Sequence, residues 1–504
     1  MVKRLWFLLL RAERLSRIHR WHFFFRYVPG AVIRRYVSQE SLLTRFLAQR
    51  SITHLQAKLS LTSRPRAATN QDDLEFNQKY EAAERSNSFS EFARQNINTS
   101  RLSPRQLELL SHVYFSSGAF GAGTRVLEQA RSVRLANQHS ELSPRIALLG
   151  LHWTNALGHL LNIERFQQLC KAGELPYDRI VVLTQQFPIP NRTFLLRLGE
   201  STPNLEVVEV NAVTAVSRAL EAFALHPSLV RDRCGNLLDA HALWDRAAWM
   251  TDESPETSTR LMTEEIKQRG DETLGKWGIG TQDEVVCLHV RSGSSGAGRG
   301  LANSDVMTYI PAIKKILAGG RQVIRMGDPS MPKLPAIDGL VDLAHSAEKS
   351  PWLDFYLWCR PRFAIGTCSG GSEAFPIFGI PTVYTNTTGV ARYPFARRSF
   401  ILPKLFRRPQ SRLPMPLSEF VASPFGRSDA LTHKSFGGVE IIDNTPDDIL
   451  AAVNEMENLL ISTDSIVPKT AAQMLLMEIR ESLGRSERSV LSRSFIDAHP
   501  YLIA

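Results

Sequence analysis

The sequence predicts an α/β protein built on mostly parallel sheets, and three observations support this class. Apolar strand-like segments alternate with helix-like segments between residues 284 and 386, as in βαβ units. Glycines and polar residues directly follow these strands, at the ends where such sheets bind ligands. A second alternation of this kind begins near residue 145, so we expect two α/β halves in this chain of 504 residues.

The first 66 residues form a basic leader. Residues 1–66 contain fourteen Lys and Arg residues against two acids, Glu13 and Glu40, while the whole chain has a net charge of only +10. The expected helix has one apolar and one basic face: Leu5, Leu8, Leu9, Ala12 and Leu15 against Arg4, Arg11, Arg14 and Arg17. We expect residues 1–35 to lie on an anionic membrane surface. The alternatives are a solvated leader and a helix packed on the protein.

Composition argues against several other classes. A nucleic-acid-binding protein usually carries a basic stripe on its folded domain, so we expect no nucleic-acid partner. The five cysteines show neither CxxC pairing nor zinc-ligand spacing, which favours a cytosolic chain. No apolar run approaches the ~20 residues that span a bilayer. These features predict a cytoplasmic protein that is peripheral on the inner face of the membrane.

A helical region is expected at residues 74–142, after a polar linker. Within it, residues 107–130 resemble a single tetratricopeptide-type hairpin, but no second copy follows at a 34-residue offset. An ordinary helical hairpin packed on the next domain is therefore the preferred interpretation.

The first α/β half is expected at residues 143–275. Asn155, Gly158 and His159 lie in the turn between its first strand and the helix that follows. A polar segment at 251–259, or the helix expected at 260–275, separates this half from the next. The expected strands are 145–152, 179–185 and 205–211.

The second α/β half is expected at residues 280–460, followed by C-terminal helices at 461–504. Helices near 446–460 and 468–484 could cover this half or cross back to the first. The expected strands are 284–291, 321–328, 339–344, 362–367 and 381–386, with helices at 305–317, at 351–359 and shortly after residue 372.

The turn at residues 367–373, which reads TCSGGSE, is the strongest local signal of a binding site. Its glycines let the backbone approach a ligand closely. The helix that follows directs its N-terminal amides towards the turn, which favours an anion. A plain connection between strand and helix would have a similar sequence.

His289 and Arg291 strengthen this prediction. Period-2 alternation places both on the same side of a strand end. A guanidinium can bind a diphosphate through two parallel hydrogen bonds. The alternative is an arginine paired with Asp305 or Asp328, beside a histidine satisfied in the core.

Together these segments resemble a bacterial family of glycosyltransferases related to the GT-B fucosyltransferase superfamily. The similarity covers roughly residues 143–410 and includes HVR, IRMGDPSM, KSPWLDFYL, FAIGTCSGGSE, FGIPTVYTN and ILPKL in that order. The resemblance implies a GT-B-like pair of Rossmann-like domains, preceded here by the helical N-terminal region. It also implies that the second domain holds most of a nucleotide-sugar.

The resemblance further implies which residues bind the donor. Arg291 would contact the diphosphate and the 367–373 turn its phosphates, while the segments around His289 and Asp328 would contact the base or ribose. The loop 155–160 would face donor and acceptor. The expected donor-binding residues are Asn155, Gly158, His289, Arg291, Asp328, Thr367, Ser369, Gly370, Gly371, Ser372 and Glu373.

Glycosyl transfer requires charge stabilisation on the leaving diphosphate and a base for the acceptor hydroxyl. Arg291 and the helix N-terminus can stabilise the charge, and the chain has no DxD motif, so we expect neither a metal nor a cofactor. His159 is the predicted base, with Glu164 as a competitor. Ser294 stands where the superfamily has an acidic residue, three positions after the arginine.

The predicted function is transfer of a sugar from a GDP- or UDP-sugar to a saccharide or glycolipid acceptor, in cell-surface polysaccharide synthesis. Two alternatives remain open. One is a non-catalytic nucleotide-binding adaptor at the membrane, which Ser294 would favour. The other is a GT-B-fold nucleotide-sugar epimerase.

Overall fold

A computed structural model describes most of the chain from residue 145 onwards. The described residues are 145–184, 189–209, 260–292, 302–388, 398–422, 439–461, 470–482 and 489–503, with short pieces between 75 and 130 and between 224 and 257. The basic leader, including residues 1–35, and Ser294 lie outside the described residues.

The first half contains a three-stranded parallel sheet in the order β1-β2-β3. Strands β1 and β2 are apolar and mostly buried, as is usual for parallel sheets covered by helices, whereas the edge strand β3 is only partly buried. The elements are β1 (Ile146–Leu149), η2 (Leu151–Trp153), α8 (Leu157–Lys171), β2 (Arg179–Thr184), α9 (Arg192–Ser201) and β3 (Leu205–Glu209), then an antiparallel pair, β4 (Leu229–Arg231) and β5 (Leu237–Asp239).

The second half contains a seven-stranded parallel sheet in the order β14-β11-β10-β9-β6-β7-β8. Strands β6 and β9 are central, and their register pairs His289 with Gly366. The strands are β6 (Val285–His289), β7 (Gln322–Arg325), β8 (Leu340–Asp342), β9 (Phe363–Gly366), β10 (Thr382–Thr387), β11 (Phe400–Pro403) and β14 (Val490–Leu491).

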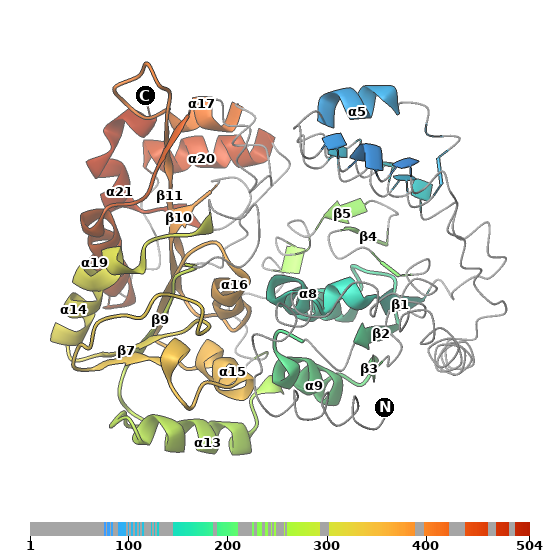
Figure 1. Cartoon of the computed structure of the whole chain (residues 1–504). Coiled ribbons are helices and arrows are strands. Elements are labelled where there is room, and N and C mark those ends of the chain that lie inside the picture. The colour runs from blue at the N-terminus through green and yellow to red at the C-terminus, as the bar shows by residue number, and fades with distance from the viewer. Residues whose placement is uncertain are drawn as a thin grey trace, which may run out of the picture.

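Helices cover both faces of this second sheet (Figure 1). Towards the first half lie α13 (Glu264–Gly275), η5 (Leu343–His345), α15 (Pro351–Cys359) and α16 (Gly370–Ile377). Elsewhere lie η4 (Val306–Tyr309), α14 (Ile310–Ala318), α17 (Leu417–Ala422), α19 (Pro446–Ile461), α20 (Ala471–Ser482), α21 (Arg493–Ala498) and η7 (Pro500–Ile503), with an antiparallel pair, β12 (Leu405–Arg407) and β13 (Glu440–Ile442).

The predicted α/β class with parallel sheets is confirmed. The C-terminal helices cover the second half, because α19 packs on α14 and β10, and α20 packs on β14. The sequence-based expectation for 461–504 named only helices. The structure adds β14, a two-residue strand that pairs with β11 at the edge of the second sheet.

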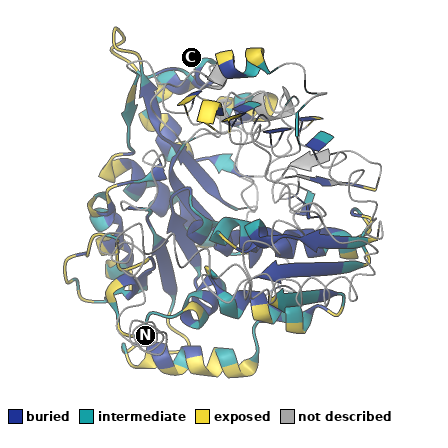
Figure 2. Cartoon of the chain, turned by 45° about the vertical axis from the view of Figure 1, so that its right-hand side comes forward, coloured by how far each residue is buried: buried dark blue, intermediate teal, exposed yellow. Residues whose placement is uncertain are grey.

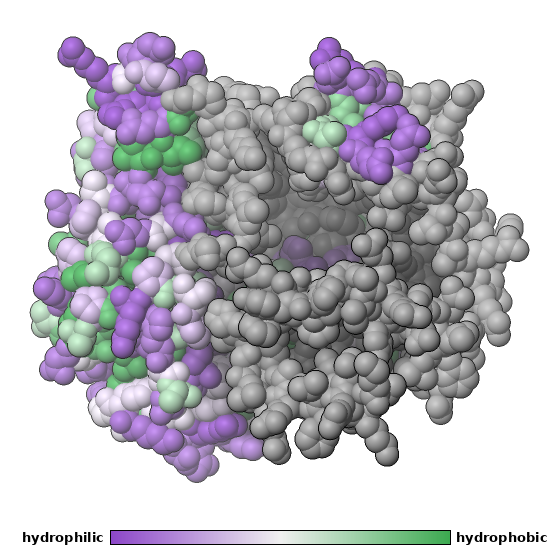
Figure 3. All heavy atoms as spheres, viewed as in Figure 1, coloured by the Kyte–Doolittle hydropathy of each residue, from purple (hydrophilic) through white to green (hydrophobic). Residues whose placement is uncertain are grey.

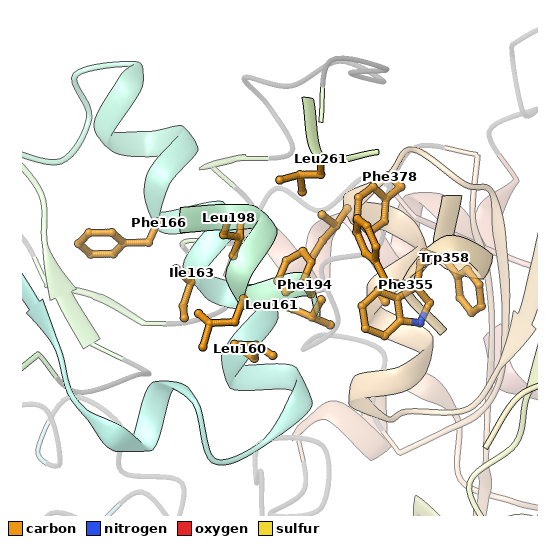
Figure 4. Packing of buried hydrophobic residues seen from close by; sticks show 14 of the residues in the cluster. Leu160, Leu161, Ile163, Phe166, Phe194, Leu198, Leu261, Phe355, Trp358 and Phe378 are labelled. Atoms are coloured by element: carbon orange, nitrogen blue, oxygen red, sulfur yellow. The ribbon is translucent and has the colours of Figure 1, made fainter. Parts of the chain in front are cut away.

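The two halves share one apolar core. Helix α8 packs on α16, and α9 packs on α15. Phe194 of α9 lies 6.1 Å from Phe355 and 6.0 Å from Trp358, ring centre to ring centre. Figure 4 shows these rings next to the leucines of α8. In Figure 2 the elements between the halves are buried, whereas α13 is exposed along its outer side.

The described pieces before residue 145 form a separate small apolar cluster, which includes Phe92 of α5 (Phe89–Gln95). The tetratricopeptide-type interpretation remains a prediction. Among the described helices, none combines the length and the apolar character needed to cross a membrane.

Candidate functional site

The candidate site lies where β6 and β9 end and where α16 and α8 begin. In Figure 1 these two helices lie side by side at the centre of the molecule. Figure 3 shows the same view with all heavy atoms. The N-termini of two helices, one from each half, therefore meet beside the carboxyl ends of the central strands.

His289 ends β6 and contacts the 367–373 turn. Its Nδ1 lies 3.0 Å from the Ser369 hydroxyl and 3.4 Å from the Ser372 hydroxyl. Burial and the nearby positive charges of Lys349 and Arg325 lower the pKa of His289 to about 4. The imidazole is therefore neutral at physiological pH and acts in hydrogen bonding rather than as a cation.

Arg291 follows β6 and is fixed through its backbone. Its amide donates to Thr367 Oγ1 at 2.9 Å, and its carbonyl accepts from the Ser304 amide at 2.8 Å. The side chain is half-buried, and its Nε donates to Asn303 Oδ1 at 3.2 Å. These contacts fix the backbone of Arg291 beside Thr367, at the start of the turn, and its role in binding stays a prediction.

The turn itself needs both of its glycines. Ser369 caps α16 by accepting a hydrogen bond from the Ser372 amide. A β-carbon on Gly371 would lie 2.3 Å from Nε2 of His289, and one on Gly370 would lie 2.5 Å from the backbone nitrogen of Gly158. Backbone at these positions can be this close only because no side chain intervenes.

Helix α8 brings residues of the first half to the same place. Gly158 is its second residue and is the neighbour of Gly370. His159 Nδ1 donates to the backbone carbonyl of His152 at 2.8 Å and lies 3.2 Å from Asn155 Oδ1. The carbonyl can only accept, so Nδ1 carries the proton and the lone pair of the neutral ring lies on Nε2. This tautomer suits a proton acceptor.

Glu373, the fourth residue of α16, also reaches this junction. Its Oε2 comes within 3.5 Å of the point that a β-carbon on Gly158 would occupy. Burial raises the pKa of Glu373 to about 7. A carboxyl group that titrates near neutral pH therefore lies between the two helix N-termini.

Asp328 differs from the other expected residues in its placement. It follows β7 in an exposed turn, where its Oδ1 accepts from the Ser330 amide at 2.9 Å. Its negative charge acts against the lowering of the His289 pKa. Asp328 thus influences the site through its charge, while its carboxylate accepts hydrogen bonds from Ser330.

Glu164, the competing candidate for the base, has a structural partner. Its side chain is fully buried, and both carboxylate oxygens accept from Arg260 Nη2 at 2.5 Å. Both oxygens of the Glu164 carboxylate are thus engaged by the ion pair with Arg260. The geometry therefore favours His159 over Glu164 as a proton acceptor.

Arg165 and Tyr384 form a buried connection between the halves that sequence reasoning missed. Arg165 lies on α8 and interacts electrostatically with Tyr384 of β10, whose hydroxyl donates to the Ser372 carbonyl at 3.3 Å. Burial lowers the pKa of Arg165 to about 10. No local pattern signals this contact, because the two residues are far apart in the sequence.

Within the described part of the chain, no group of His, Cys, Asp and Glu side chains is arranged to hold a metal ion. The described site is built from backbone amides, hydroxyls, two histidines, one guanidinium and one carboxyl group.

No protein-family model and no curated protein matches this chain. Several solved glycosyltransferases are similar in structure. A family 9 glycosyl transferase from Veillonella parvula has 12% identity and a TM-score of 0.36, covering 64% of this chain and 98% of its own. ADP-heptose LPS heptosyltransferase II from E. coli has 12% identity and a TM-score of 0.35, covering 63% and 98%.

The iron-containing dodecameric glycosyltransferase TibC from enterotoxigenic E. coli has 15% identity and a TM-score of 0.33, covering 64% of this chain and 78% of its own. Similarity at this level assigns no function to the chain. The relation to the fucosyltransferase superfamily remains a prediction.

Proposed function

We propose that the protein is a GT-B-type glycosyltransferase, which moves a sugar from a nucleotide-diphosphate donor to a saccharide or glycolipid acceptor. The observation that carries this proposal is the meeting of α8 and α16 at Gly158 and Gly370, beside His289 and Arg291. A diphosphate has two or three negative charges to satisfy, and helix N-termini with an arginine supply suitable donors.

The described residues divide the reaction between the halves. Arg291 and the N-terminal amides of α16 would stabilise the charge that develops on the leaving diphosphate, a task that needs no metal ion in this arrangement. His159, on the first half, would take the proton of the acceptor hydroxyl through Nε2. GDP- and UDP-sugars are the proposed donors, and cell-surface polysaccharide synthesis is the proposed setting.

A panel of GDP-, UDP-, ADP- and CMP-sugars tests the proposal through thermal shifts and through release of the nucleotide. We expect one class of donor to stabilise the full-length protein and to be turned over with a saccharide acceptor. Addition of EDTA should leave the rate nearly unchanged. If no nucleotide-sugar binds below millimolar concentration, the proposed function is wrong.

Variants of Arg291 identify the site. Arg291→Ala should weaken donor binding by roughly 10- to 100-fold, the value of a charge-assisted hydrogen bond or two. Arg291→Lys should also be impaired, since a point charge cannot replace the two-pronged contact. Arg407→Ala is the matched control, because Arg407 pairs with Glu440 across the antiparallel β12–β13 pair, at the surface. Equal binding by all variants would contradict the assignment of Arg291.

A further inference from the structure

The carboxyl group of Glu373 lies where the proposed diphosphate would bind. A single point, the position of a β-carbon on Gly158, is 3.5 Å from Glu373 Oε2 and 3.8 Å from the Cα of Gly370. Gly370 is the first residue of α16, whose amides we assign to the diphosphate. The carboxyl group therefore lies beside the first residue of α16, at the contact between the halves.

The carboxyl group of Glu373 makes no hydrogen bond or ion pair with the described residues. Burial is the cause of its raised pKa. The other titratable or charged groups on the surrounding elements are His159, Glu164, Arg165, Cys170 and Lys171 on α8, Asp354, Tyr356 and Cys359 on α15, Cys368 before α16, Tyr384 on β10, and Cys287 and His289 on β6.

An ionised Glu373 and a diphosphate bound at the start of α16 would repel each other, and Glu373 is buried from water. Like charges at short range in a partly buried site destabilise each other far more than in bulk water. The conflict disappears if the carboxyl group is neutral. In that state its O–H becomes a hydrogen-bond donor, which is what a phosphate oxygen needs.

We propose that Glu373 binds the diphosphate of the donor as a neutral acid, taking up one proton from solvent as the ligand enters and donating it in a hydrogen bond to a phosphate oxygen. This inference rests on the proposed function. No covalent bond forms or breaks in this step. The proton comes from the buffer, and the ligand supplies the negative charge that holds it on the carboxyl group.

In the folded protein Glu373 is already easier to protonate than an exposed glutamate. Burial already raises the pKa of Glu373 to about 7, so protonation at neutral pH requires little free energy. A bound diphosphate raises the pKa further, and linkage then requires that protons strengthen diphosphate binding by the same factor. Affinity should therefore fall as pH rises above 7, by about tenfold per pH unit at most.

Calorimetric titration of the full-length protein with GDP and with UDP measures this proton directly. Carried out at pH 8 in HEPES and in Tris, whose heats of ionisation differ, it gives the number of protons taken up. The wild type should take up most of one proton at pH 8 and little at pH 6, where Glu373 is already protonated. Wild-type protein suffices for this measurement.

Glu373→Gln keeps the shape of the neutral acid and removes the titration. This variant should bind at pH 8 up to about tenfold more tightly than the wild type, with weak pH dependence. Its proton uptake should be near zero. Glu264→Gln is the matched control, since Glu264 also lies in the first turn of a helix, α13, but is highly exposed. It should behave as the wild type.

The outcomes separate the two proposals. If GDP or UDP binds the wild type without proton uptake at pH 8, the role of Glu373 is wrong while the diphosphate site stands. The same conclusion follows if Glu373→Gln takes up as many protons as the wild type. If neither nucleotide binds the wild type at millimolar concentration, the site and this inference both fail.

Discussion

The His289 imidazole connects the candidate site to the stability of the fold. Its pKa is lowered to about 4 in the folded protein, against about 6.5 in an unfolded chain. Between these values the unfolded state binds a proton that the folded state does not. The stabilising contribution is therefore complete above pH 6.5 and is lost as the pH falls towards 4.

We expect urea denaturation to show this loss. Between pH 7.5 and pH 4.5 the wild type should lose about 2 kcal/mol more unfolding free energy than His289→Gln, which has no imidazole to titrate. His345→Gln serves as the control for an exposed histidine. An identical pH dependence in wild type and His289→Gln would show that the pKa of His289 is the same in the folded and unfolded states.

Sequence periodicity was sufficient to place His289 and Arg291 at one strand end, because alternation along a strand is a local property. It was also sufficient to place Ser369 and Gly371 in a turn before a helix. It could not show that a β-carbon at Gly371 would meet the His289 ring at 2.3 Å. That requirement depends on two segments 82 residues apart in the chain.

At the scale of elements, the crossing of α8 and α16 is the contact that assembles the site. The two glycines at this crossing are not equivalent. A β-carbon on Gly370 would lie 2.5 Å from the backbone nitrogen of Gly158, whereas one on Gly158 would have no atom closer than 3.5 Å. Because both backbones are fixed in helices, moving them apart to fit a methyl group would cost free energy.

Gly370→Ala should therefore destabilise the protein by about 1–3 kcal/mol, the usual cost of overpacking, and should weaken donor binding. Gly158→Ala makes the same chemical change on the other side of the contact and should leave the unfolding free energy nearly unchanged, since alanine favours helix formation. Thermal denaturation of both variants measures the difference in stability. Equal effects from the two substitutions would show that the helices do not cross as described.

Most of the elements could be predicted from the sequence. Helix α15 begins and ends where the PWLDFYLWC segment does, because its Pro start and apolar surface are strong local signals. Strand β14 was missed because two residues carry no periodicity. The crossing of α8 with α16 was not predictable, since it depends on how α9 and α15 pack between the halves.

At the scale of the whole molecule, the basic leader predicts that the protein binds membrane surfaces. We predict that residues 1–35 hold the protein on anionic membranes. Each basic residue near such a surface contributes about 1 kcal/mol, and this attraction weakens as salt screens it. Buried Leu and Phe side chains would add a part that does not depend on salt.

Binding of the full-length chain to anionic liposomes should therefore fall with added NaCl without vanishing. Deletion of residues 1–35 should release the protein into the supernatant after centrifugation. A helix packed on the protein would instead give equal sedimentation with neutral and anionic vesicles, or no change on deletion.

The aromatic rings shared by α9 and α15 also limit how substrates can enter and leave. Many two-domain enzymes open and close about a hinge, which is the expected behaviour when the interface between domains is small and polar. Here Phe194, Phe355 and Phe378 form one apolar cluster across the halves, so swinging them apart would expose that cluster to water. Donor exchange should therefore proceed with the two halves still docked.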